Sequence, residues 1–237
     1  DLHSLRRRQR QMCIRDRIRN ERPGDYRETE EVTREAFWNV HEPGCCEHYL
    51  AHLMRERPEF IRELDFVAVR DGRIVGNIMY ARTEIQCDDG TTHPAVTFGP
   101  ISVLPAYQGQ GIGKRLIETS KKLAADMGAD VIIIYGDPDY YSKTGFVPAE
   151  TYGVRNGENQ CAAALLACLL KPEAAASIKG RYSEGPAYEL PPVTDPAFLE
   201  FEETFPPKIK GKAPSQERFA ELVNSTVPWE ERAKGQD

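Results

Sequence analysis

The segment Val96–Gly113, VTFGPISVLPAYQGQGIG, decides the fold, because it joins an apolar run to a glycine-rich turn and then to a predicted helix. Gly109, Gly111 and Gly113 let the main chain approach a ligand closely. The first turn of a helix presents N–H groups without partners inside the helix, together with the positive end of the helix dipole. The segment therefore predicts a site for an anionic group such as a phosphate.

Two common phosphate-binding loops do not fit this spacing. A Walker A loop would need glycine at position 108 and serine or threonine at position 115, where the chain has Gln108 and Arg115. A dinucleotide-binding loop that starts at Gly109 would need glycine at position 114, which is Lys114. A loop that binds the phosphates of a free nucleotide is therefore disfavoured.

The remaining pattern is Gln108-x-x-Gly111-x-Gly113, preceded by a strand that ends at Ile101-Ser102-Val103 and by Pro105, which stops strand pairing. It resembles the acetyl-CoA pyrophosphate loop, Q/R-x-x-G-x-G/A, of the GCN5-related N-acetyltransferase (GNAT) family.

A second segment strengthens the resemblance. The β-branched run Val131–Tyr135 is suited to a buried parallel strand, and a helix-length stretch separates it from the loop. After it, the pattern Y-Y-x-x-x-G-F ends at Gly145-Phe146 and is similar to the second cofactor-side motif of the family. Together the two segments cover about residues 96–147, and a looser family pattern extends from about residue 18 to 170.

The resemblance implies an α/β fold with a mixed, mostly antiparallel twisted sheet. In that fold a central pair of parallel strands splays apart, and helices flank both faces. Gly99-Pro100 is a candidate bulge for the splaying, because proline removes a ladder donor and glycine bends easily. The gap would admit the pantetheine arm of acetyl-CoA.

The resemblance also implies the site residues. Main-chain groups of the strand end would pair with pantetheine and polarise the thioester, and the loop would hold the pyrophosphate; the set is Ile101, Ser102, Val103, Gln108, Gly109, Gln110, Gly111, Ile112, Gly113 and Lys114. Tyr141 stands where the family places a tyrosine that protonates the leaving thiolate, although two adjacent tyrosines can also be core residues. No metal is implied.

The general base is not identified. Some family members carry a glutamate on the central strand where this chain has Thr97, whose hydroxyl can only orient a water. Glu84 and His93 are weaker candidates. The resemblance places the acceptor beside the loop between the first two helices, so we expect substrate contacts within residues 38–47.

Local signals predict the remaining elements. They comprise an edge strand at 17–20, helices at about 23–39 and after Gly44, and hairpins that turn at Asp71-Gly72 and at 88–90. A helix should follow the loop and end near Gly128, and residues 161–170 should form a closing strand, with helix as the competitor. A short helix from Pro172 and amphipathic stretches at 195–205 and 215–225 follow.

We expect three parts in the chain. Residues 1–16 hold five arginines and few apolar side chains, which indicates a disordered or non-native leader. Residues 17–170 would form the acetyltransferase domain. Residues 171–237 have too little apolar content for a separate core, so we expect them to pack on the domain as an extension.

Composition narrows the class of protein. With 31 Lys and Arg against 37 Asp and Glu, the formal net charge is −6, which argues against binding to nucleic acid or to an anionic membrane. The sequence has neither a long apolar run nor a signal-peptide pattern, so we expect a cytoplasmic protein. The six cysteines show no paired spacing, and the His and Cys residues between His41 and His52 lack the second half of a zinc motif.

The expected function is transfer of acetyl from acetyl-CoA to a primary amine of a small molecule or peptide, in a ternary complex. The alternative is a non-catalytic module that binds or senses acyl-CoA. A homodimer is an open expectation, since the family often dimerises.

Overall fold

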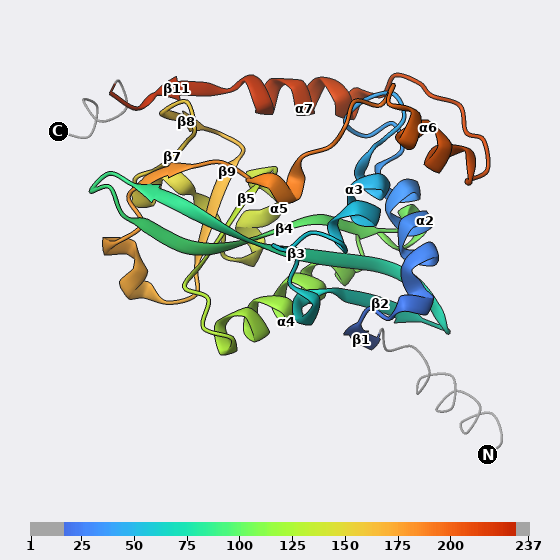
Figure 1. The fold of residues 1–237 in the computed structure, drawn as a ribbon, viewed down its shortest axis with the longest axis horizontal. Helices are drawn as coiled ribbons and strands as arrows, with labels where there is room; N and C mark the ends of the chain where they lie inside the picture. Colours follow the sequence, from blue (N-terminus) through green and yellow to red (C-terminus); the bar gives the residue numbers. More distant parts are fainter. Residues whose placement is uncertain (1–16, 231–237) are drawn as a thin grey trace, which may run out of the picture.

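The computed structural model describes residues 17–230, so the predicted leader at 1–16 lies outside the described residues. The main sheet has the strand order β1-β2-β3-β4-β5-β9-β6, and β10 joins β3 to β7 at one end. Most neighbours are antiparallel, whereas β4 and β5 are parallel. Figure 1 shows α4 on one side of the sheet and the C-terminal elements on the other. The predicted mixed fold is confirmed.

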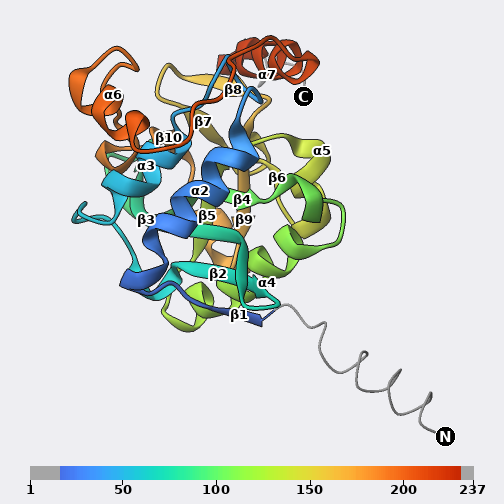
Figure 2. The same cartoon turned by 90° about the vertical axis from the view of Figure 1, so that its right-hand side faces the viewer.

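The N-terminal elements follow the local signals closely. Strand β1 (Arg17–Asn20) is followed by the 3-10 turn η1 (Pro23–Asp25), helix α2 (Tyr26–Phe37) and helix α3 (Glu47–Met54). Thr33 on α2 donates a hydrogen bond to Asn77 on β3, and the hydroxyl of Ser102 on β4 donates one to Thr33, so α2 packs directly over these strands. The two helices lie side by side in Figure 2.

Two hairpins build the centre of the sheet. After the turn η2 (Arg62–Leu64), strand β2 (Phe66–Arg70) pairs with β3 (Arg73–Cys87) through Asp71 and Gly72, whose φ angles are +50° and +81°. Positive φ at both central residues is what a type I′ turn requires, so the predicted hairpin is confirmed. Strand β4 (Thr92–Val103) returns along β3 from the second predicted turn.

A crossover connects β4 to β5. The 3-10 turn η3 (Pro105–Tyr107) leads into helix α4 (Ile112–Asp126), and Gly128, at φ +95°, ends it before β5 (Val131–Tyr135). Helix α5 (Pro138–Tyr141) and η4 (Ser142–Thr144) follow, then β6 (Val147–Pro148), η5 (Ala149–Tyr152) and β7 (Val154–Asn156).

The apolar run near residues 161–170 forms strands, so the competing helix prediction is wrong there. It contains β8 (Gln160–Ala162) and β9 (Leu165–Leu169), and β9 pairs antiparallel with β5 over five residues. Four of the five β9 residues are buried. Tertiary burial against β5 therefore outweighs the helix propensity of its alanine and leucines.

The chain after residue 170 contributes to the sheet and wraps over it. Its elements are η6 (Pro172–Ala176), β10 (Gly180–Tyr182), η7 (Pro186–Tyr188), α6 (Pro196–Glu203), α7 (Pro214–Asn224) and β11 (Thr226–Pro228), which pairs with β8. The short helix predicted from Pro172 forms only a 3-10 turn. In Figure 1, α7 runs along the top of the molecule between β11 and the region of α2 and α3.

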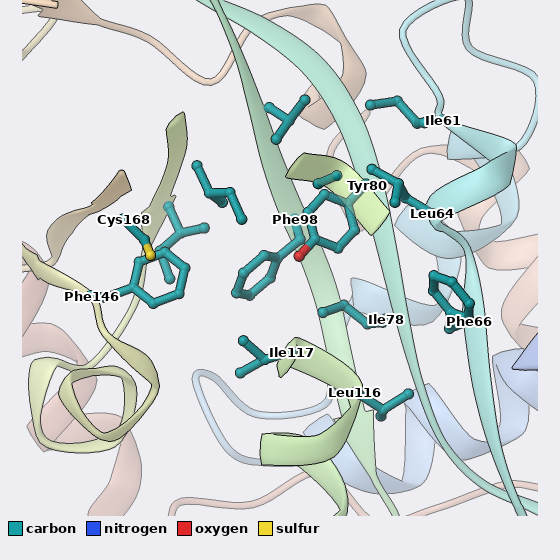
Figure 3. Packing of buried hydrophobic residues seen from close by; sticks show 14 of the residues in the cluster. Ile61, Leu64, Phe66, Ile78, Tyr80, Phe98, Leu116, Ile117, Phe146 and Cys168 are labelled. Atoms are coloured by element: carbon teal, nitrogen blue, oxygen red, sulfur yellow. The ribbon is translucent and has the colours of Figure 1, made fainter. Parts of the chain in front are cut away.

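The main core lies between the sheet and α4. Leu116 and Ile117 of α4 are buried against Ile78 and Phe98 of the sheet (Figure 3). Ile112 of the same helix belongs to this cluster. A second cluster, on the opposite face, includes Ile85, Ile133 and Tyr182. No helix among residues 17–230 is long and apolar enough to cross a membrane.

Candidate active site

Strands β4 and β5 separate at the middle of the sheet. They pair at a single register position, Val96 with Ile132. On the other side of β4, Ile78 faces Ile101 and Tyr80 faces Phe98, so Gly99 and Pro100 together oppose one residue of β3. This irregularity is the predicted bulge. Within the described chain, the β4 edge beyond it is unpaired on the β5 side and leaves main-chain groups for a ligand.

The glycine-rich loop delivers the start of α4 to the same gap. Gly109 and Gly111 have φ angles of +72° and +79°, which L-residues with a side chain rarely adopt. Gly111 is the N-cap residue, and no side chain caps the helix. Ile112 is buried and anchors the first turn. The N–H groups of this turn therefore point outward and fit an anion.

The two glutamines of the loop brace its own backbone. Gln108 Nε2 donates to the Val103 carbonyl at 3.0 Å, and Gln110 Nε2 donates to the Ala106 carbonyl at 3.2 Å. Arg70 from β2 donates to Gln110 Oε1 at 2.6 Å. These bonds fix the shape of the loop, so the side chains of Gln108 and Gln110 act as struts in this structure.

Tyr140 reaches across to the start of α4. A Cβ atom on Gly113 would lie 2.2 Å from the Tyr140 hydroxyl, so only glycine allows this approach without a shift. Tyr140 is also exposed on its outer side. The hydroxyl therefore lies beside the helix N-terminus as an additional polar group.

Tyr141 is held on the α4 side of the gap. Its ring centroid lies 4.9 Å from that of Tyr140, 5.9 Å from that of Phe98 and 5.9 Å from that of Phe146. A Cβ atom on Gly136 would lie 2.3 Å from the Tyr141 ring, so the ring packs directly on the backbone. Burial raises the pKa of this phenol above its ordinary value. It therefore keeps its proton at neutral pH, as a general acid must.

Thr97 lies on the opposite face of β4. It is buried, and the hydroxyls of Tyr182 and Tyr188 lie close to it. Tyr188 Oη donates to the Gly99 carbonyl at 3.3 Å, whereas the buried Tyr182 hydroxyl has no hydrogen-bond partner among the described residues. The position of the family's strand glutamate is thus lined by three hydroxyl groups.

The two weaker candidates for the base lie elsewhere. Glu84 is exposed and accepts a hydrogen bond from Gln86 on the same strand at 2.7 Å. His93 is near the start of β4, where its Nε2 lies 3.7 Å from an Asp130 carboxylate oxygen. Neither side chain faces the gap beside Thr97.

The loop between α2 and α3 is covered by the C-terminal chain. Trp38 Nε1 and Asn39 Nδ2 both donate to the Ile209 carbonyl, at 3.0 and 3.2 Å. The His41 ring stacks on Phe219 of α7 with a centroid distance of 4.2 Å. Segment 38–47, where we expected acceptor contacts, is therefore bordered by residues 209–219.

The histidines of this region are engaged with carboxylates. His48 Nε2 lies 2.8 Å from Glu202, His41 Nδ1 lies 2.8 Å from Glu47, and His52 pairs with Glu30 at 3.0 Å. Burial lowers the pKa of His48. Among residues 17–230, no group of three or more His, Cys, Asp or Glu side chains has a metal-binding arrangement.

The structure brings together the predicted cofactor residues and Tyr141 around one gap. Sequence reasoning missed Tyr135, Tyr182 and Tyr188, because they come from three distant segments. The only local signal for the last two is that Tyr182 and Tyr188 flank a short Ser-Glu-Gly-Pro segment, which is typical of a turn.

This arrangement, a splayed parallel strand pair beside an uncapped helix N-terminus, defines the acetyltransferase class of fold. The comparisons with known proteins agree with it. Residues 63–148 match the family model described as the acetyltransferase (GNAT) domain.

Two curated relatives come from Escherichia coli. The uncharacterized N-acetyltransferase YjhQ of strain K12 is 33% identical over 87 residues, which are 36% of this chain and 46% of YjhQ. The uncharacterized N-acetyltransferase YhbS is 28% identical over 107 residues, which are 45% of this chain and 61% of YhbS. The matched region thus spans less than two thirds of these relatives.

Solved structures cover more of the chain. The structure of E. coli YhbS in complex with CoA has a TM-score of 0.65 at 24% identity and covers 73% of this chain and 92% of that one. A GNAT family acetyltransferase from Brucella melitensis in complex with acetyl-CoA has a TM-score of 0.60 at 27% identity, with coverages of 74% and 99%. Residues 63–148 of this chain thus match the GNAT acetyltransferase domain, and both solved structures share its fold.

Proposed function

We propose that this protein transfers the acetyl group of acetyl-CoA to a primary amine of a small molecule or peptide, by direct attack in a ternary complex. The observation that best supports this proposal is the gap between β4 and β5. The gap has an unpaired strand edge on one side and an uncapped helix N-terminus at its end. CoA and acetyl-CoA in the two similar structures support this ligand.

The residues of the gap fit a CoA thioester. Main-chain groups of Ile101, Ser102 and Val103 would hydrogen-bond the pantetheine arm, because the β4 edge lacks a neighbour there. The N–H groups between Gly109 and Lys114 would hold the pyrophosphate. The thioester would supply an activated acyl group.

Tyr141 would act as the general acid of the reaction. Its position beside Phe98 on β4 places the phenol on the α4 wall of the gap. A protonated phenol in this apolar setting can donate its proton to the departing thiolate. An amine held on the Thr97 side would approach the acyl carbon from the opposite direction.

A second function has one observation in its favour. Thr97 replaces a carboxylate that some family members carry, so the chain could bind acyl-CoA as a sensor without catalysing transfer. A thiol-release assay with acetyl-CoA separates the two functions. We expect at least one amine among polyamines, aminoglycosides, arylalkylamines and peptide N-termini to accelerate release. Saturable acetyl-CoA binding without any acceptor-dependent release would favour the sensor, and tighter binding of ATP than of acetyl-CoA would exclude both.

A further inference from the structure

The chain from Tyr182 to Tyr188 bridges the gap on its acceptor side. At one end, the Tyr182 ring lies 6.0 Å from that of Tyr135 at the end of β5. At the other end, the Tyr188 hydroxyl donates to Gly99 on β4, and its ring lies 3.3 Å from the position of a Gly99 Cβ. The two ends thus touch the two strands that separate, and Glu184 lies between them in sequence.

Glu184 lies in the short connection between β10 and η7. Strand β10 ends at Tyr182, which is fully buried. Gly185 turns the chain at a φ angle of +79° before η7 begins at Pro186. Glu184 is therefore held between two anchored tyrosines, in the part of the chain that bridges the gap.

The surroundings of Glu184 consist of phenols from three elements. Its charge acts on Tyr135 of β5, Tyr182 of β10 and Tyr188 of η7. It makes no ion pair within residues 17–230, and its side chain keeps solvent access. Burial by the surrounding protein raises the pKa of the carboxyl group. The site thus holds an unpaired carboxylate with no cation beside it.

We propose that Glu184 is the carboxylate that binds the cationic amine of the acceptor and takes its proton. The inference rests on the proposed acetyl transfer and assigns the base that the β4 strand lacks. An ammonium group in the gap would find the Glu184 carboxylate, a ring of phenol oxygens and the Thr97 hydroxyl. This chemistry selects a primary aliphatic amine that is protonated at neutral pH.

The proton balance of the step is complete with these groups. Glu184 takes one proton from the ammonium group and passes it to water. The neutral nitrogen then forms the N–C bond while the C–S bond breaks, and Tyr141 gives its proton to the thiolate. The nitrogen loses its second proton, which restores Tyr141 through solvent. The products are the acetamide, the CoA thiol and one proton.

A pair of CoA thioethers tests the proposal without knowledge of the natural acceptor. S-(2-aminoethyl)-CoA carries an ammonium group next to the sulfur, and S-propyl-CoA is its neutral isostere. Isothermal titration calorimetry with the full chain should show about tenfold tighter binding of the aminoethyl compound, which corresponds to one moderately screened charge pair. Glu184→Gln should remove this preference and leave the affinity for S-propyl-CoA unchanged.

The matched control is Glu189→Gln, which removes an exposed carboxylate five residues further along. It should keep the wild-type preference. The preference should also disappear in wild type as pH falls through the raised pKa of Glu184, because the three phenols that face it stay neutral throughout that range.

The outcomes separate the inference from the function on which it rests. Equal binding of both thioethers to wild type, or a preference that survives in Glu184→Gln, would overturn the assignment of Glu184 and leave the cofactor site intact. Failure of wild type to bind either thioether and acetyl-CoA would instead overturn the proposed function itself.

Discussion

The proposed cofactor side and the proposed acceptor side of the gap are built in different ways. The cofactor side comes from one continuous stretch, β4 through η4, and its features are backbone features: an unpaired edge, glycines at positive φ and an uncapped helix. The acceptor side is assembled from side chains of β4, β5, β10 and η7. Local sequence can therefore specify the first side, whereas tertiary structure is needed to assemble the second.

Among the single substitutions, Tyr141→Phe should have the largest effect, and the effect should be on turnover alone. The variant keeps the aromatic packing on Gly136 and removes only the acidic proton. We expect a loss of about 10²- to 10³-fold in kcat for thiol release, the usual range for a general acid. The affinity for acetyl-CoA, measured by calorimetry, should not change. Tyr26→Phe, at the start of α2 and away from the gap, is the control. Wild-type turnover in Tyr141→Phe would mean that Tyr141 is not the general acid.

The second largest effect concerns the long-range contacts that hold the C-terminal chain on α2 and α3. Glu202 on α6 accepts hydrogen bonds from Arg34 on α2 and from His48 on α3, both buried. Glu202→Ala leaves the buried Arg34 without its partner, so we expect a loss of about 2–3 kcal/mol in the free energy of unfolding. Urea denaturation measures it. The control is Glu203→Ala at the exposed neighbour, which should change the free energy of unfolding by less than about 0.5 kcal/mol. Equal effects of the two variants would mean that the Glu202 contacts contribute little to stability.

A third variant tests the backbone character of the cofactor side. Gly111→Ala forces a side chain into the left-handed region, at a cost of about 1–2 kcal/mol. The loop should relax this strain by moving, so we expect acetyl-CoA to bind about tenfold more weakly. Gly72→Ala places the same strain in the β2–β3 turn. The Gly72→Ala variant should lose a similar amount of stability but keep its affinity for acetyl-CoA. Equal losses of affinity in both variants would show that the loss does not arise from the loop at Gly111.

The smallest expected effect concerns the buried Asp65 and the dependence of the protein's stability on pH. Asp65 is buried, and burial together with the neighbouring Glu21 raises the pKa of its carboxyl group. The folded state then holds a proton that the unfolded state releases above about pH 4, so the stability from this group falls as pH rises. Asp65→Asn keeps the neutral form and should add about 1 kcal/mol at pH 8, or about 2–4 °C in Tm, and less at pH 5. A variant that is less stable than wild type at pH 8 would reverse the assigned direction.

The same contrast explains what the sequence could predict. Asp71-Gly72, Gly128 and the loop glycines predict the hairpin, the helix end and the phosphate site, because each depends on local φ angles. The Gly99-Pro100 bulge is predictable because proline removes a ladder donor and glycine bends easily. Strand β9 was ambiguous, since only its burial against β5 decides between strand and helix.

The acceptor side was not predictable from periodicity or motifs. Glu184 and Tyr188 lie more than 80 residues from Thr97, and only the pairing of β10 with β3 brings them to the gap. The cover over segment 38–47 consists of individual contacts, such as the hydrogen bonds from Trp38 and Asn39 to Ile209 and the stacking of His41 on Phe219. Such contacts leave no regular pattern in the sequence.

The most direct test of the central claim is a crystal structure of the protein with acetyl-CoA. We expect the pyrophosphate at the N–H groups of residues 109–114 and the acetyl group between β4 and Tyr141, with its open side toward Glu184. A cofactor bound instead in a hollow at the β3 edge, beside Arg82 and Arg181, would contradict this expectation.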